Sequence, residues 1–284
     1  INANEAIKTI REKSIDLIIT DHHILQTEIP KVFALLHPIT TPKDSPYKDL
    51  AGVGLAYILA NQLIKEDKSS LDSNDLLHLF CIGTIADMSK VNGVNRYFLR
   101  MGLQDFMSSK IPGIQALLQR SNVKKNKIYS EDISFKIAPR INSVGRIGDP
   151  KLIIDLLSQN DEEKTKVIAG EVELLNKKRR KLSEKIELEA FNMIEKNPEL
   201  AKGFIVLSHP DWHPGVIGIV ASRIVEKYNR PTAILGGYRN NQLRGSLRTA
   251  VGISIIDALE SCSELLVTHG GHKGAGGLTI DSNN

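Results

Sequence analysis

Residues 16–23 read DLIITDHH, a short apolar run that ends in one carboxylate and two imidazoles. The run is typical of a buried β-strand, and the pattern of residues 1–15, INANEAIKTIREKSI, predicts a helix before it. Alternation of helix and strand indicates a largely parallel sheet. In such sheets the chemistry gathers where strands end, which makes Asp21, His22 and His23 the first candidate site.

The rest of the first half continues the alternation. Gly52–Ile64 (GVGLAYILANQLI) predicts a buried helix, and Leu76–Ala86 (LLHLFCIGTIA) predicts a further apolar element that delivers Asp87 at its end. The first half is therefore expected to be an α/β domain with a parallel sheet.

The second half is organised around one long amphipathic helix, predicted over residues 161–198 by apolar residues spaced three, four, seven or eight apart. It carries the basic run Lys177–Lys181, followed by acidic residues, and a solvated face with balanced charges is the plainer interpretation. A smaller α/β unit follows. We therefore expect three parts, with bounds at 1–160, 161–198 and 199–284.

Composition places the chain among globular proteins. Of its 284 residues 41% are hydrophobic and 25% charged, and a net charge of +4 does not by itself indicate a polyanionic partner. No apolar run reaches the ~20 residues of a membrane span, so a cytoplasmic location with no membrane partner is the default expectation. Cys81 and Cys262 lie in apolar contexts without metal-site spacing, and we expect two buried, reduced thiols.

The candidate metal ligands each have an ordinary alternative. A carboxylate with two imidazoles suits Mn, Fe, Co or Zn, but Asp21, His22 and His23 could also be a surface or core histidine pair. Adjacent histidines on a strand point to opposite sides, so one can bind a metal while the other faces substrate. Asp87 ends a buried element, where an acidic group must be paired or metal-bound, or else caps a helix.

Several blocks taken together carry a family resemblance. TDHH, then PYKDLAGVGLAY, then GTIADM with VNGVNRYFLRMGL, resembles the DHH phosphoesterase superfamily. The block at 137–150, IAPRINSVGRIGDP, resembles the RecJ branch. DWHPGVIGIVASRIVEKYNRPTAIL, RGSLRTAVGISIIDALE and THGGHKGAGGLTI are similar to successive blocks of the DHH-associated domain, DHHA1. The blocks stand in family order over almost the whole chain.

The resemblance implies a fold and a metal site. Residues 1–160 would be a partial DHH domain with a parallel sheet, 161–198 a connecting helix and 199–284 a smaller α/β DHHA1 domain that binds nucleic acid. His22 and Asp87 would bind metal in a centre of two divalent ions, Mn²⁺ or Mg²⁺. His23 would stand beside the scissile phosphate, and Asp21 would orient the imidazoles.

The resemblance also implies a set of contacts to nucleic acid or phosphate. These are Arg140, Asn142, Arg146, Ser222, Arg223, Ser246, Arg248, Gly270, Gly271 and His272. Gly270, Gly271 and His272 are expected in a glycine-rich loop that a nucleic-acid backbone could approach closely, with a tight turn as the alternative. Trp212 and His213 are candidates for stacking, although a lone tryptophan more often belongs to a core.

The implied activity is that of a single-stranded-DNA-specific 5′-3′ exonuclease, which hydrolyses phosphodiesters with two metals and releases 5′-mononucleotides in DNA repair and recombination. Single-stranded DNA, a single-strand-binding protein and a helicase are the implied partners of a monomer. The family also has an Asp-x-Asp block and another aspartate upstream, and an oligonucleotide-binding domain downstream. We expect this chain to be a fragment without them, and to have little or no nuclease activity alone.

Three other activities compete with this one. An oligoribonuclease or cyclic-dinucleotide phosphodiesterase of the DHH type shares the triplet, but the PRINSVGR block speaks against it. A non-catalytic module that binds single strands would not need His22, His23 or Asp87. A manganese pyrophosphatase shares only the first domain and ranks last.

Overall fold

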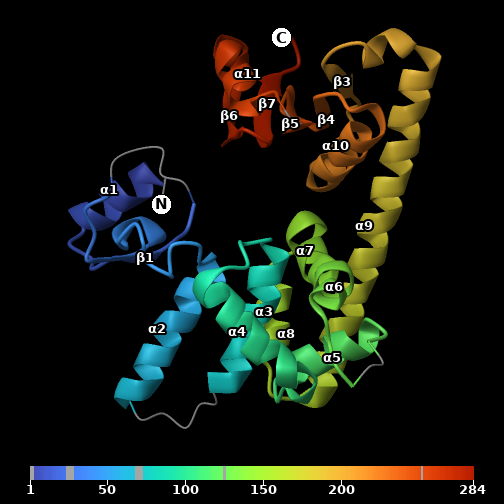
Figure 1. Cartoon of the computed structure of the whole chain (residues 1–284). Helices are drawn as coiled ribbons and strands as arrows, with labels where there is room; N and C mark the ends of the chain where they lie inside the picture. Colours follow the sequence, from blue (N-terminus) through green and yellow to red (C-terminus); the bar gives the residue numbers. More distant parts are fainter. Residues whose placement is uncertain (1–2, 24–28, 68–72, 124–125, 251) are drawn as a thin grey trace. The chain divides into compact units, whose positions relative to one another are not determined.

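The computed structural model describes residues 3–23, 29–67, 73–123, 126–250 and 252–284. It divides into two compact units (Figure 1). Unit 1 comprises Ile1–Asn142 and Pro150–Glu173, and unit 2 comprises Ser143–Asp149 and Leu174–Asn284. The expected domain bounds at residues 160 and 198 stay a prediction.

Unit 1 is mostly helical, with a small sheet near its start. Its helices and strands are α1 (Asn4–Glu12), β1 (Ile18–Thr20), β2 (Ala34–Leu36), α2 (Gly52–Asp67), α3 (Ser73–Ala86), α4 (Gly93–Asp105), α5 (Pro112–Arg120), α6 (Ser130–Asp132), the start of α7 (Ala138–Ile147), α8 (Lys151–Ser158) and the start of α9 (Glu162–Lys196). Short 3₁₀ turns lie at Pro38–Thr40 and Phe106–Ser108, and a π-helical turn at Ile133–Ile137 joins α6 to α7.

The predicted strand at residues 16–20 exists as β1, and it pairs in parallel with β2, so that Thr20 lies opposite Leu36. Its burial differs from the expectation. Ile18 is 55% exposed, because the described part of unit 1 gives β1 only one neighbouring strand.

The core of unit 1 forms around α3, which packs against α2 and α4. Phe80 on α3 is fully buried and meets the rings of Tyr57 and Phe98 at centroid distances of 5.4 and 5.5 Å. Cys81, beside it, is buried as predicted, and burial together with the negative charge of Asp105 raises the pKa of its thiol to about 12. The apolar character of 76–86 therefore reflects a core helix that ends at Asp87.

Helix α9 is the long amphipathic helix that the spacing predicts, over Glu162–Lys196 rather than 161–198. Its buried side chains include Val172, Ile186 and Ala190, which recur on one face. Neither α9 nor any other helix in the described ranges combines the length and apolarity needed to cross a membrane.

Unit 2 is a five-stranded mixed sheet with the strand order β3-β4-β5-β7-β6. Its elements are β3 (Ile205–Ser208), α10 (Pro214–Tyr228), β4 (Thr232–Arg239), β5 (Gln242–Arg248), α11 (Ile255–Ser261), β6 (Leu266–His272) and β7 (Ala275–Asp281). β3 and β4 are parallel, and the remaining pairs are antiparallel. The strands at GFIVLS, TAILGG and GLTI are therefore present, as is the helix after the Gly-rich turn.

The two faces of this sheet carry different cores. On β4, Ile234 packs with α9 and α10, whereas its neighbours Ala233 and Leu235 pack with α11. Alternation along a strand sends successive side chains to opposite faces, so α10 and α11 cover opposite sides of the sheet. Cys262, which follows α11, is half-buried rather than buried, because it lies at the edge of the smaller core.

Trp212 belongs to the larger core and is not a stacking platform. Its side chain is 1% exposed, and its indole Nε1 donates to Glu189 Oε2 at 2.7 Å. Gly236 on β4 packs directly against it, since a Cβ at Gly236 would lie 2.4 Å from the Trp212 carbonyl oxygen. The tryptophan is thus an internal probe of unit 2.

We expect Gly236→Ala to lower the free energy of unfolding of unit 2 by about 1–3 kcal/mol, because the added methyl group overpacks the core at Trp212. Urea unfolding followed by the fluorescence of the single tryptophan measures the loss. Gly203→Ala is the matched control, since a Cβ there meets nothing within 4 Å. Equal stabilities for the two variants would contradict the packing described here.

Candidate metal-ligand residues and phosphate pocket

The triplet Asp21, His22 and His23 leaves the carboxyl end of β1. The Asp21 amide donates to Leu36 O of β2 at 3.1 Å, so the sheet holds the first residue of the triplet. Asp21 Oδ1 accepts from the amides of His22 and His23 at 2.7 and 3.1 Å and lies 2.7 Å from His23 Nδ1. One carboxylate thereby fixes both the backbone of the triplet and the ring of His23.

The ionisation of Asp21 follows from these contacts. Partial burial raises the pKa of the carboxyl, but the hydrogen bonds that it accepts, including those from His23 and His22, outweigh burial and lower the pKa below its ordinary value. Because an ionised carboxylate only accepts, Nδ1 of His23 carries the proton. The side chain of His23 is 75% exposed, which leaves Nε2 accessible to a ligand.

His22 and Asp87 converge from different elements. His22 Nε2 lies 3.9 Å from Asp87 Oδ1, and both side chains are partly exposed. Ser89 Oγ donates to Asp87 Oδ2 at 2.5 Å, so Oδ1 is the oxygen left toward the imidazole. An imidazole nitrogen and a carboxylate oxygen fit two positions of a divalent metal such as Mn²⁺. Within the described residues no group of three or more His, Cys, Asp or Glu could hold a metal.

His37 is a site residue that the sequence reasoning missed. It follows β2 directly, is 6% exposed, and accepts from the Ile39 amide through Nδ1 at 3.0 Å. Its Nε2 therefore donates to the carbonyl oxygen of His23 at 2.9 Å. The signal was a histidine at the end of the second parallel strand, where the chain meets the triplet.

Asp49 was also missed, and it holds the segment after Asp87. It accepts from Asn92 Nδ2 at 2.9 Å and lies 3.5 Å from Lys90 Nζ. The Asn92 hydrogen bond, helped by the charge of Lys90, lowers the pKa of Asp49. Buried Asn95 donates to the carbonyl oxygens of Asp49 and Lys90, which clamps the turn that carries Asp87.

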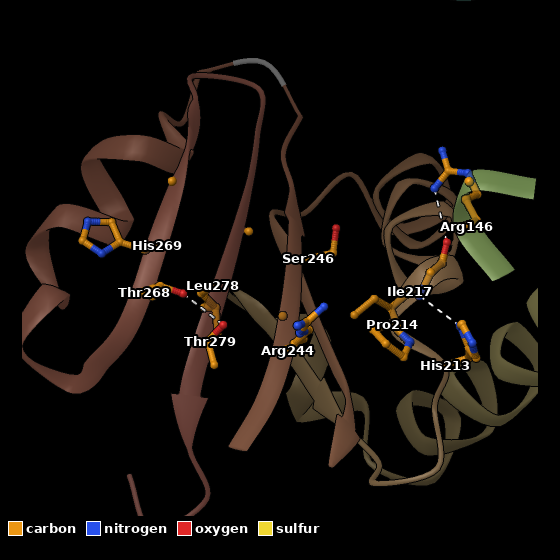
Figure 2. A pocket seen from close by; sticks show the side chains of 15 residues that line it. Arg146, His213, Pro214, Ile217, Arg244, Ser246, Thr268, His269, Leu278 and Thr279 are labelled. Atoms are coloured by element: carbon orange, nitrogen blue, oxygen red, sulfur yellow. Dashed lines mark hydrogen bonds between the residues drawn. The ribbon is translucent and has the colours of Figure 1, made fainter. Parts of the chain in front are cut away.

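Unit 2 contains a pocket of about 690 Å³ at the N-terminal end of α10. Figure 2 shows Arg244 and Ser246 on β5, Pro214 and His213 at the start of α10, and Arg146 from the end of α7 around it. The first turn of a helix carries partial positive charge. In α10 Pro214 has no N–H, and the amides of Gly215 and Val216 donate to His213. Polar and cationic groups thus gather at an end that favours anions.

The floor of the pocket is backbone from three strands. Gly277 on β7 pairs with Ser246 on β5 and with Gly270 on β6, and a Cβ at Gly270 would meet nothing within 4 Å. The prediction of a glycine-rich loop here is therefore wrong, because these residues form a β-strand. Gly270, Gly271 and His272 lie in β6, because they form ladder pairs with β7 and leave only a short turn after His272.

The wall of the pocket forms where α10 lies very close to the end of α7 and to β5. A Cβ at Gly215 would lie 2.0 Å from the carbonyl oxygen of Arg146, whose Nη1 donates to Gly215 O at 3.3 Å. A Cβ at Gly218 would lie 2.7 Å from Ser246 Oγ and 3.1 Å from Arg248 Nη2. Arg248 Nη1 in turn lies 3.2 Å from Ser246 Oγ. Glycine at both positions of α10 lets α7 and β5 come this near.

The guanidinium groups of unit 2 repel one another. Burial lowers the pKa of Arg146, and burial followed by the charge of Arg146 lowers the pKa of Arg248. Burial also lowers the pKa of Arg179, as do the charges of Arg180, Arg146 and Arg223. A bound anion would relieve this repulsion, and phosphate oxygens suit guanidinium donors.

Two of the expected phosphate contacts belong to unit 1. Arg140 is held by unit 1 itself, since Nε donates to Glu173 at 2.6 Å and Nη2 donates to Arg120 O at 3.0 Å. Asn142 is exposed. Their roles in nucleic-acid binding stay predictions.

The remaining expected contacts lie in unit 2 outside the pocket lining: Ser222, Arg223, Arg248, Gly271 and His272. Ser222 Oγ donates to Gly218 O within α10 at 3.2 Å, and Arg223 forms an ion pair with Glu187 of α9. His272 is exposed and accepts from the Gly274 amide. These assignments also stay predictions.

Arg244 lines the pocket and was not foreseen. His213, expected as a stacking candidate, lines the pocket and caps α10 by accepting from the Gly215 amide at 3.0 Å. Arg179 is half-buried and donates to Asn176 Oδ1 at 2.8 Å, although it sits within the basic run that predicted a solvated face. Its position on the inner side of α9 was the available signal.

Comparisons with known proteins agree with this arrangement. The model of the DHH family, N-terminal domain, matches residues 1–84, and the DHHA1 domain model matches residues 201–284. A Bacillus subtilis protein named single-stranded-DNA-specific exonuclease RecJ is 36% identical over 281 residues, which is 99% of this chain and 35% of that protein. The Escherichia coli protein of the same name is 31% identical over 299 residues, 99% of this chain and 52% of that protein. The chain thus spans about a third to a half of these curated relatives.

Solved structures give the same picture. A crystal structure of exonuclease RecJ bound to manganese superposes on this chain with a TM-score of 0.82 at 30% sequence identity. The match covers all of this chain and 69% of the RecJ chain. RecJ from Thermus thermophilus in complex with Mn²⁺ superposes with a TM-score of 0.86 at 30% identity, over all of this chain and 41% of that one. The chain belongs to the RecJ family of proteins with DHH and DHHA1 domains.

Proposed function

We propose that this chain supplies metal-binding and phosphate-binding parts of a nuclease that hydrolyses single-stranded DNA with two divalent ions, Mn²⁺ or Mg²⁺. The pocket at the start of α10 carries the proposal, because it gathers Arg146, Arg244 and Ser246 beside a helix N-terminus. The names of the relatives, and the manganese and magnesium in their structures, support the substrate and the metals.

In the pocket, a backbone phosphate would sit on the side-chain-free floor at Gly270 and Gly277. Ser246 Oγ and the guanidinium of Arg146, both in the pocket lining, would donate to its oxygens. The pocket lining combines Gly145, Gly215, Gly245, Gly270 and Gly277 with the cationic side chains of Arg146 and Arg244, which favours a phosphate.

In unit 1, His22 Nε2 and Asp87 Oδ1 would each bind a metal ion. Two divalent ions supply activation of water and neutralisation of charge on the phosphodiester oxygens. Asp21 would hold the ring of His23 through Nδ1, and His23 Nε2, when it carries a proton, would donate to a phosphate oxygen. Ser89 and His37 would keep Asp87 and the triplet in place.

The finer features of the activity come from the family resemblance. These are 5′-3′ polarity, release of 5′-mononucleotides, a role in DNA repair and recombination, a monomeric state, and partnership with a single-strand-binding protein and a helicase. We also propose that the 284-residue chain alone has little nuclease activity, since its described residues offer His22 and Asp87 but no group of three metal-binding side chains.

A non-catalytic single-strand-binding module is the second candidate. The same lack of a larger ligand group favours it, because the pocket of unit 2 can hold a phosphate without any metal. Metal-dependent cleavage by the protein with its upstream carboxylates separates the two candidates.

Inorganic phosphate should stabilise unit 2 by binding in the pocket beside Arg146. At a phosphate concentration ten times its Kd the expected gain is about 1.4 kcal/mol, measured by urea unfolding with Trp212 fluorescence. Arg146→Gln should remove most of this gain. Arg239→Gln, which removes an exposed arginine outside the pocket, should retain it. An undiminished gain in Arg146→Gln would refute the pocket assignment.

Nuclease activity should depend on His22 once the upstream carboxylates are present. We expect the protein extended by those blocks to degrade single-stranded DNA with Mn²⁺, and His22→Ala to reduce the rate by at least about 100-fold, because a metal ligand is lost. Release of nucleotides from a labelled strand measures this rate. His209→Ala, in unit 2 and outside the pocket lining, is the control.

The 284-residue chain should release no more than traces of nucleotide under the same conditions. Rapid digestion by this chain, abolished by His22→Ala, would overturn its proposed inactivity. An extended protein that binds DNA but never cleaves it would favour the binding module.

A further inference from the structure

The outer face of α9 in unit 2 is strongly basic. Lys177, Lys178, Lys181 and Lys185 are all exposed, and they recur at spacings of three and four that place them on one side of the helix. We call these four the basic stripe. The buried residues Asn176, Ser183 and Ile186 mark the opposite side, which packs within unit 2.

The outer face carries more basic than acidic side chains, since beside the four lysines it holds one exposed carboxylate, Glu184. The plainer interpretation of the basic run, a solvated face with balanced charges, stays a prediction. Glu187 pairs with Arg223, and Glu189 accepts from the Trp212 indole, so both acids are engaged with unit 2. Lys185 lies 3.8 Å from Glu189, but the other three lysines form no ion pair within the described residues. A concentrated positive field is left facing solvent.

The stripe also offers apolar contact. It borders a shallow hollow of about 670 Å³ whose lining includes Leu174 and Leu182, with one carboxylate, Glu184, at its edge. Leu174 is 67% exposed. A duplex presents phosphates outward and stacks its bases inside, whereas a single strand offers both phosphates and free base faces.

We propose that the basic stripe is a second binding surface for single-stranded DNA, separate from the pocket at α10. The inference extends the proposed function. From Lys177 to Lys185 the helix rises about 12 Å, over which a strand at a rise of ~3.4 Å presents about three phosphates. Lysines suit this role because each is a point charge that needs no fixed geometry. Binding to this surface should therefore not depend on the base sequence of the DNA.

The test compares two triple variants that remove the same charge. One is Lys177→Ala, Lys178→Ala and Lys181→Ala. The control is Lys164→Ala, Lys166→Ala and Lys202→Ala, which removes exposed lysines already paired with Asp161, Glu163 and Glu199. Binding of a long thymidine oligonucleotide is followed by fluorescence anisotropy over a range of salt concentrations, with Trp212 fluorescence as the check on folding.

We expect the stripe variant to lower the slope of log K against log salt by about 2, from about 0.7 for each lost phosphate contact, while the control changes it little. Equal slopes for wild type and the stripe variant would overturn the surface. A larger loss with duplex than with single-stranded DNA, or equally strong binding of polyglutamate, would overturn the assignment of the partner. Binding that depends on Arg146 but not on the stripe would overturn this inference and leave the proposed function standing, whereas no binding by wild type would overturn both.

Discussion

The approach of the Arg146 carbonyl to the first turn of α10 is the constraint on which the pocket depends. Only glycine at position 215 leaves room for that carbonyl, since a Cβ would lie 2.0 Å from it. The contact brings the end of α7, which lies far away in the sequence, onto the DHHA1 part of the chain and places the Arg146 side chain there. Gly218, about one turn later, likewise leaves room for the side chains of Ser246 and Arg248.

The cost of this packing is electrostatic. Guanidinium groups held near one another, at the positive end of a helix, repel one another, and a bound anion lowers that repulsion. A polyanion that binds there reduces the repulsion between these guanidinium groups, which adds to its binding free energy. The candidate metal ligands differ from the pocket. The Asp21 carboxylate accepts hydrogen bonds from the amides of His22 and His23, and His22 Nε2 lies 3.9 Å from Asp87 Oδ1.

Most of the fold could be predicted from periodicity and turn residues. The strand before the triplet, the apolar helix that ends at Asp87 and the long helix after residue 160 all follow from local patterns. The burial of β1 could not, because it depends on how many strands lie beside it. Gly270 and Gly271 lie in a strand although a loop was predicted. A run of glycines in the sequence looks the same whether it leaves space for a ligand or turns the chain.

The site was recovered unevenly for a similar reason. His22 and Asp87 were named from the family resemblance, and the structure brings them near each other. His37, Asp49 and Arg179 act through tertiary hydrogen bonds with partners that no local pattern reveals. Charge in the basic run was visible in the sequence, but its division into an inner Arg179 and an outer stripe required the helix to be placed against unit 2.

A crystal structure of this chain with a short thymidine oligonucleotide tests the central claim most directly. The account predicts a backbone phosphate over Gly270 and Gly277, with its oxygens about 3 Å from Ser246 Oγ and from the guanidinium of Arg146. A base in the pocket, or an oligonucleotide bound with the pocket left to water, would contradict it.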